Sequence, residues 1–95
     1  MNNDISNLKN ITVLYVEDEK DLREVTSSIL QSFTKNQYIA TNGQEGYDLF
    51  LKHDSDIDLI ISDINMPILN GLEMIKKIKD IKLFNLILLK MFQSL

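Results

Sequence analysis

The chain has 95 residues, enough for one domain built around one hydrophobic core. Hydrophobic residues make up 44% and charged residues 25%, which is typical of a folded globular chain and argues against disorder. The net charge of -4 without a basic stripe argues against direct nucleic-acid binding, and the lack of cysteine excludes a disulfide framework, a cysteine-ligated zinc site and a cysteine nucleophile.

The first residues have no positively charged region followed by an apolar run, so we expect no secretory signal. The longest apolar runs are far shorter than the roughly 20 residues that cross a bilayer. We therefore expect a cytoplasmic protein without membrane contact.

The first half of the chain predicts a strand, a helix and a second strand. Residues 11–16 are β-branched, aromatic and apolar, which indicates a buried strand ending at the acidic triplet 17–19. A helix over about residues 20–33 is predicted by the spacing of Leu22, Val25, Ile29 and Phe33. Residues 37–41 are less apolar and suit an edge strand.

After the turn at Asn42 and Gly43 a second helix is expected, with Tyr47, Phe50 and Leu51 facing inward. The polar linker that follows contains His53, the only histidine, which we interpret as a solvated surface residue.

Residues 59–61 form a continuous apolar run that ends at Ser62 and Asp63, as in a strand buried on both faces. A loop over residues 66–71 leads into a third helix, whose apolar stripe comprises Leu72, Ile75, Ile78 and Ile81. Met66 and Met74 are interpreted as packing residues, and Lys76, Lys77 and Lys79 as a solvated face. Strands that alternate with helices predict an α/β fold with a doubly wound parallel sheet.

Acidic side chains follow the two strands that should form the centre of this sheet. If these strands are neighbours, about 4.8 Å apart, Glu17, Asp18 and Asp63 converge on one pocket at the carboxyl edge. Three carboxylates so close repel one another, and a divalent cation with oxygen ligands relieves that repulsion. The pocket therefore predicts Mg²⁺ and a phosphate.

Each acidic segment also has a structural interpretation. Residues 17–19 alone are more often the first turn of a helix, where carboxylates meet the positive end of the helix dipole, and Asp63 alone suits a cap or turn. Their joint spacing, followed by Asn65, Met66 and Pro67, favours the pocket.

Residues 13–19 (VLYVEDE) and 60–71 (IISDINMPILNG) resemble the receiver domain of bacterial two-component response regulators, over about residues 9–80. The resemblance implies a flavodoxin-like sheet of order 2-1-3-4 in one receiver-like domain over residues 1–95. It implies that Asp63 accepts a phosphoryl group and also binds Mg²⁺, that Asp18 binds Mg²⁺ directly, that Glu17 binds mainly through water, and that Asn65 offers its main-chain carbonyl. A sensor histidine kinase or phosphotransfer protein would be the donor, and the domain, not otherwise an enzyme, would catalyse only its own phosphorylation and dephosphorylation.

The chain departs from this family after about residue 80. A complete receiver domain has about 120 residues, so the fifth strand, its terminal lysine and the last helix have no counterpart here. In the family, a threonine or serine that contacts the phosphoryl group ends the fourth strand. Residues 81–95 form a divergent apolar tail in which Lys90 and Ser94 lack the local pattern of that position, and residues 86–89 suit either a fourth strand or a continued helix. We therefore expect a truncated or frame-shifted receiver with an exposed apolar edge that favours a homodimer.

Two other functions remain open at this level. A truncated pseudo-receiver that acts only as a protein-interaction module would keep the fold and lose the switch. A haloacid-dehalogenase-like phosphohydrolase is disfavoured, because that family needs a second acid two positions after its nucleophile, where this chain has Asn65.

Overall fold

The structure, a computed structural model, describes residues 5–79 and 86–89. Its elements in chain order are a 3₁₀ helix η1 (Ile5–Asn10), β1 (Thr12–Val16), α1 (Lys20–Phe33), β2 (Asn36–Ala40), α2 (Gly43–His53), β3 (Leu59–Asp63), α3 (Gly71–Lys79) and β4 (Leu86–Leu89). The first helix has the predicted bounds, and the strands differ from prediction by one or two residues at their ends. The short η1 was not predicted.

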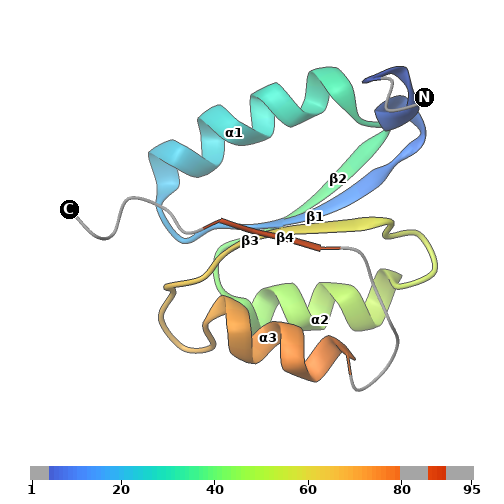
Figure 1. The fold of residues 1–95 in the computed structure, drawn as a ribbon. Coiled ribbons are helices and arrows are strands. Elements are labelled where there is room, and N and C mark those ends of the chain that lie inside the picture. Colours follow the sequence, from blue (N-terminus) through green and yellow to red (C-terminus); the bar gives the residue numbers. More distant parts are fainter. Residues whose placement is uncertain (1–4, 80–85, 90–95) are drawn as a thin grey trace.

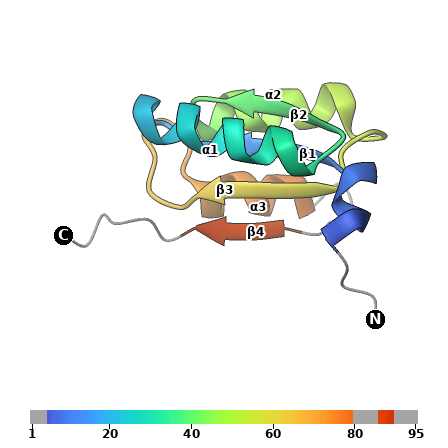
Figure 2. The same cartoon turned by 90° about the horizontal axis from the view of Figure 1, so that it is seen from above.

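The four strands form one parallel sheet in the order β2-β1-β3-β4 (Figures 1 and 2). This confirms the predicted α/β class and strand order. In the sheet, Val16 pairs with Ala40 on β2 and with Ser62 on β3, and Asp63 pairs with Leu89 on β4. All strands therefore end at the same edge, where ligands bind in open sheets of this kind.

The hydrophobic core lies between the sheet and the layer formed by α2 and α3 (Figure 1). Its centre consists of fully or almost fully buried side chains from both layers: Leu14, Val16, Ala40, Phe50, Ile60, Met74 and Ile78. Met66 also lies in this core, which confirms packing roles for both methionines. Burial of these apolar side chains is the main favourable term holding the layers together.

Helix α1 covers the opposite face of the sheet by itself (Figure 1), and none of its residues is buried. Val25, Ile29 and Phe33 are 59%, 53% and 37% exposed. Their spacing of four residues places them on one stripe, so the helical pattern was right. The 3₁₀ helix η1 contacts α1, and among the described residues no second α-helix packs beside it.

Two residues predicted to face the core do not. Leu51 and Leu72 are each 50% exposed. Leu51 follows the buried Phe50 directly, and neighbouring helix positions point about 100° apart, so both cannot face the same layer. Leu72 occupies the first turn of α3, beside the fully buried Met74 and ahead of Ile75 and Ile78. The inward face of α3 therefore consists of Gly71, Met74, Ile75 and Ile78.

Residues 86–89 form a strand paired with β3, which decides between the two conformations considered for them. Ile81, Lys90 and Ser94 lie outside the described residues. Within the described ranges, no helix is long and apolar enough to cross a membrane.

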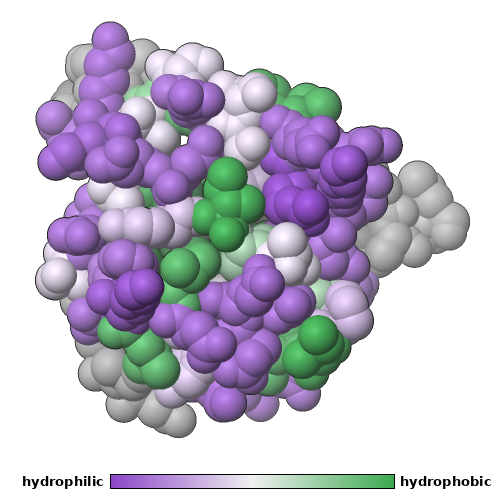
Figure 3. All heavy atoms as spheres, turned by 180° about the vertical axis from the view of Figure 1, so that it is seen from behind, coloured by the Kyte–Doolittle hydropathy of each residue, from purple (hydrophilic) through white to green (hydrophobic). Residues whose placement is uncertain are grey.

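His53 is half-buried, so its interpretation as a solvated surface residue holds only in part. Its ring stacks on that of Tyr38, with centroids 4.1 Å apart and planes inclined by 11°. Tyr38 lies on β2 and His53 ends α2, so the stack joins the edge strand to the helix. The face on the β2 side is otherwise mainly hydrophilic, with small separate hydrophobic patches (Figure 3).

The lysines of α3 are exposed, as expected of a solvated face, but one of them also has a partner. The Lys77 ammonium lies 4.8 Å from the centre of the Tyr47 ring, a cation–π distance. This contact links α3 to α2.

Candidate functional site

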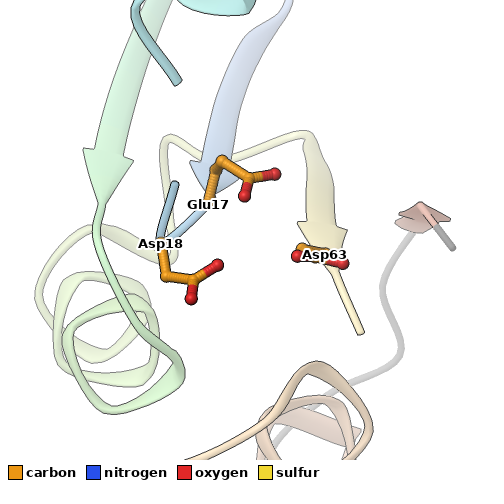
Figure 4. A group of neighbouring side chains, drawn as sticks. All are labelled: Glu17, Asp18 and Asp63. Atoms are coloured by element: carbon orange, nitrogen blue, oxygen red, sulfur yellow. The ribbon is translucent and has the colours of Figure 1, made fainter. Parts of the chain in front are cut away.

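The structure brings the side chains of Glu17, Asp18 and Asp63 together at the carboxyl edge of the sheet (Figure 4). Each offers a carboxylate oxygen, and these oxygens lie within 4.8 Å of one another. Glu17 and Asp18 follow β1, and Asp63 ends β3, the strand that pairs with β1. Parallel pairing thus aligns two strand ends that are far apart in the sequence.

The three carboxylates differ in their access to water. Glu17 is 1% exposed and Asp63 5%, whereas Asp18 lies at the surface. The site therefore has a dry side along the sheet and an open side at Asp18. A ligand would enter from the open side and meet charges that are poorly screened by solvent.

The Glu17 side chain is held in place and only partly satisfied. Its Oε2 accepts a hydrogen bond from the Glu19 main-chain N–H at 3.1 Å, while Oε1 is buried and has no hydrogen-bond partner among the described residues. Burial raises the pKa of Glu17 to about 7, against the lowering effect of the Glu19 N–H, and the charges of Asp63 and Asp18 raise it further. A cation in the pocket would stabilise the ionised form.

The Glu19 side chain caps helix α1 and does not join the carboxylate cluster. It is the N-cap of α1, and its Oε1 accepts the Leu22 main-chain N–H at 2.8 Å. Both interpretations of the acidic triplet therefore hold for different members: two residues form the cluster and the third caps the helix.

The loop from Ile64 to Asn70 joins Asp63 to α3 and is tightly constrained at its end. Asn70 and Glu73 cap the helix reciprocally, each side chain accepting the other's main-chain N–H, at 2.9 and 3.0 Å. A Cβ atom at Gly71 would overlap the main-chain oxygen of Asp63, so the chain needs glycine at this close approach. Asn65 is exposed in this loop.

Ile68, in the middle of the same loop, has the left-handed backbone angle φ of 72° and is 77% exposed. This conformation costs a β-branched residue about 1–2 kcal/mol. The sequence pattern gave no sign of it.

Two further residues of the site were not identified from the sequence. The Arg23 Nη1 donates to the main-chain oxygens of Glu17 at 3.0 Å and of Asp18 at 3.2 Å. Tyr15 is fully buried on β1 two residues before Glu17, and burial raises the pKa of its phenol, an effect to which the charges of Glu17 and Asp63 add. In the sequence, Arg23 appears as one charge on a polar helix face and Tyr15 as one more apolar strand residue.

The sequence matches one known protein family over most of its length. The family model described as response regulator receiver domain matches residues 13–93. Among curated proteins, the two-component response regulator ORR42 of Oryza sativa is 37% identical over 70 residues, which is 74% of this chain and 52% of that protein.

Two solved structures show the same fold at comparable identity. The N-terminal domain of an uncharacterized protein from Wolinella succinogenes has a TM-score of 0.75 and 36% identity, covering 88% of this chain and 68% of that one. The receiver domain of the Saccharomyces cerevisiae response regulator Ssk1, crystallised with the histidine phosphotransfer protein Ypd1, has a TM-score of 0.71 and 31% identity, covering 78% and 50%. The chain spans about half the length of ORR42.

Proposed function

Because the chain belongs to the response regulator receiver domain family, we propose that it accepts a phosphoryl group on Asp63 in two-component signalling. The observation that carries this proposal is the approach of three carboxylate oxygens to within 4.8 Å at the end of β3, with Asp63 almost fully buried. A bound cation would relieve the repulsion among these carboxylates and would attract a phosphate to the site.

The residues present fit Mg²⁺. All side-chain donors of the cluster are carboxylate oxygens, and the buried Glu17 Oε1 without a partner is an acceptor for which a cation or its water would compensate. Asp18, on the open side, and Asp63 are proposed as side-chain ligands. Glu17 is proposed to act mainly through water, and Asn65 to supply a main-chain carbonyl. When bound, Mg²⁺ would neutralise charge on the transferring phosphoryl group.

In the proposed reaction, an Asp63 carboxylate oxygen attacks the phosphorus atom of a phosphohistidine on the donor protein. A P–O bond forms while the P–N bond breaks, and the imidazole keeps the electron pair. The donor is proposed to be a sensor histidine kinase or a phosphotransfer protein, a class supported by the Ypd1 complex of the related Ssk1 receiver. The domain itself supplies the catalysis of transfer and of later hydrolysis. The phosphoryl group of the proposed donors comes ultimately from ATP, so we propose that the protein acts in the cytoplasm.

A second function is favoured by the end of β4. Leu89 lies beside Asp63 in the sheet register, where the resemblance implies a threonine or serine that would contact the phosphoryl group. A receiver fold without that hydroxyl suits a protein-interaction module that binds Mg²⁺ but does not switch. The two functions differ in whether the acceptor becomes labelled.

Labelling with acetyl phosphate tests the first function. The wild-type protein with Mg²⁺ should gain one hydroxylamine-sensitive phosphoryl group, and Asp63→Asn should gain none. Asp48→Asn removes an exposed aspartate on α2 and serves as the matched control, which should label like wild type. Absence of label on folded wild type, or equal labelling of Asp63→Asn, would exclude Asp63 as acceptor; Mg²⁺ binding without label would support the interaction module.

We further propose that two copies of the chain associate through the exposed edge of the sheet at β4, which ends the strand order β2-β1-β3-β4 among the described residues. Sedimentation of the wild-type protein at high concentration should show a dimer, and a monomer under those conditions would contradict this proposal.

A further inference from the structure

We propose that Arg23 is a positioning residue for the metal-binding carboxylates, which it sets through the main chain of the loop between β1 and α1. This inference rests on the proposed Mg²⁺ site. Arg23 is the only arginine of the chain, and its guanidinium donates to the main-chain oxygens of both Glu17 and Asp18.

The two buried acids have other means of support. The Glu17 main-chain N–H donates to the Ala40 oxygen of β2 at 3.0 Å, and its side chain accepts from Glu19. Asp63 is the last residue of β3 and is paired within the sheet. Their positions therefore follow from strand pairing.

Asp18 lies beyond the end of β1 and before the first turn of α1, at the surface. Within the described part of the chain, the hydrogen bond that fixes its main chain is the one from Arg23 to its carbonyl oxygen. The peptide groups on either side of the Asp18 Cα are thus joined to one side chain, since Arg23 also holds the Glu17 oxygen. Fixing both peptides limits the directions in which the Asp18 carboxylate can point.

The chemistry of arginine suits this role. One guanidinium nitrogen carries two hydrogens in a plane, so Nη1 can donate to two oxygens at 3.0 and 3.2 Å at once. Arg23 belongs to α1, and its own main-chain N–H donates to the Glu19 oxygen at 2.9 Å. The contact therefore ties the loop to the first turn of a helix, a rigid element.

An effect of Arg23 through its charge alone and an effect through positioning predict opposite changes in Mg²⁺ affinity when Arg23 is replaced. A guanidinium beside the cluster repels a cation, so removal of its charge should strengthen Mg²⁺ binding if Arg23 acted only electrostatically. A positioning role predicts weaker binding when the carbonyl contacts are lost, even if the charge stays. The sign of the change separates the two.

Mg²⁺ titration by calorimetry, at low salt and on metal-free protein, provides the test. Arg23→Lys keeps the charge and loses the planar donor pair, and Arg23→Gln loses both; each should weaken binding about tenfold, as is usual when the support of a metal ligand is removed. Lys20→Gln removes a charge from the same helical turn and should bind like wild type or slightly more tightly. Unchanged binding by Arg23→Lys, or tighter binding by Arg23→Gln, would overturn the inference.

A second measurement guards against a general loss of structure. In an Asp18→Ala background, Arg23→Lys should have no further effect on Mg²⁺ affinity, because its action passes through Asp18. An equal loss in both backgrounds would mean that Arg23 supports the fold and not the ligand. Wild type that binds no Mg²⁺ would remove both the proposed function and this inference, whereas wild-type binding that is insensitive to Arg23 would remove the inference alone.

Discussion

Replacement of Glu17 by glutamine should stabilise the metal-free protein at neutral and alkaline pH. The Glu17 side chain is 1% exposed, and burial together with nearby charge raises its pKa from 4.5 to about 7. The ionised carboxylate is thus less favourable in the folded than in the unfolded chain. Glutamine keeps the shape and an oxygen for the Glu19 N–H, and it carries no charge.

The direction of the pH dependence follows from the two pKa values. Below pH 4.5 the group is protonated in both states and contributes nothing, whereas above pH 7 it is ionised in both and the full cost is present. The unfolding free energy of the wild type should therefore fall as pH rises between these values. At roughly 1.4 kcal/mol for each pKa unit, the difference between 4.5 and about 7 amounts to roughly 3–4 kcal/mol at most.

Urea unfolding followed by circular dichroism in EDTA, at several pH values between 4.5 and 8, measures this effect. Glu17→Gln should exceed wild type by roughly 3–4 kcal/mol at pH 8 and by little at pH 4.5. Glu24→Gln, which removes an exposed carboxylate from α1, is the matched control and should differ from wild type by about 0.5 kcal/mol or less throughout. A difference between Glu17→Gln and wild type that does not vary with pH would refute the reasoning.

Two further predictions concern the scaffold. Gly71→Ala places a Cβ atom against the Asp63 main-chain oxygen. It should lower the unfolding free energy by about 2 kcal/mol or more and reduce labelling by acetyl phosphate. A variant with the thermal unfolding and labelling of wild type would contradict the close approach. Phe50→Ala, at a fully buried position, should cost about 3–5 kcal/mol in urea unfolding, whereas Phe33→Ala, at a position 37% exposed, should cost about 1 kcal/mol or less; equal losses would mean that both faces of the sheet are packed alike.

The positions of the central elements could be predicted because local patterns determine them. The β-branched run before Glu17 and the apolar run before Asp63 each fit a strand buried on both faces, and each ends where the polar residues begin. Once two parallel strands are neighbours, their carboxyl ends must meet. The convergence of the acidic residues therefore required only the assumption of adjacency.

Tertiary contacts were not predictable in the same way. The stack of His53 on Tyr38 depends on how the end of α2 meets β2, and neither residue stands in a pattern that indicates the other. The exposure of Ile29 shows the same limit for helices, because periodicity identifies which side chains share a face and not what covers that face. Arg23 was missed because its partners are main-chain oxygens, which leave no trace in the sequence.

Because no residue of α1 is buried, the two helical layers should differ in how often they open locally. A helix without a buried side chain can detach from the sheet in a local opening that leaves the core intact, so its amides should exchange with solvent sooner than those of β1 and β3. Arg23 and the N-cap Glu19 lie in the first turn of that helix. Each such opening would release Asp18 as well, so that a cation held by Asp18 would slow the fraying of α1. The affinity for the cation and the rate of amide exchange in α1 would then depend on the same opening equilibrium.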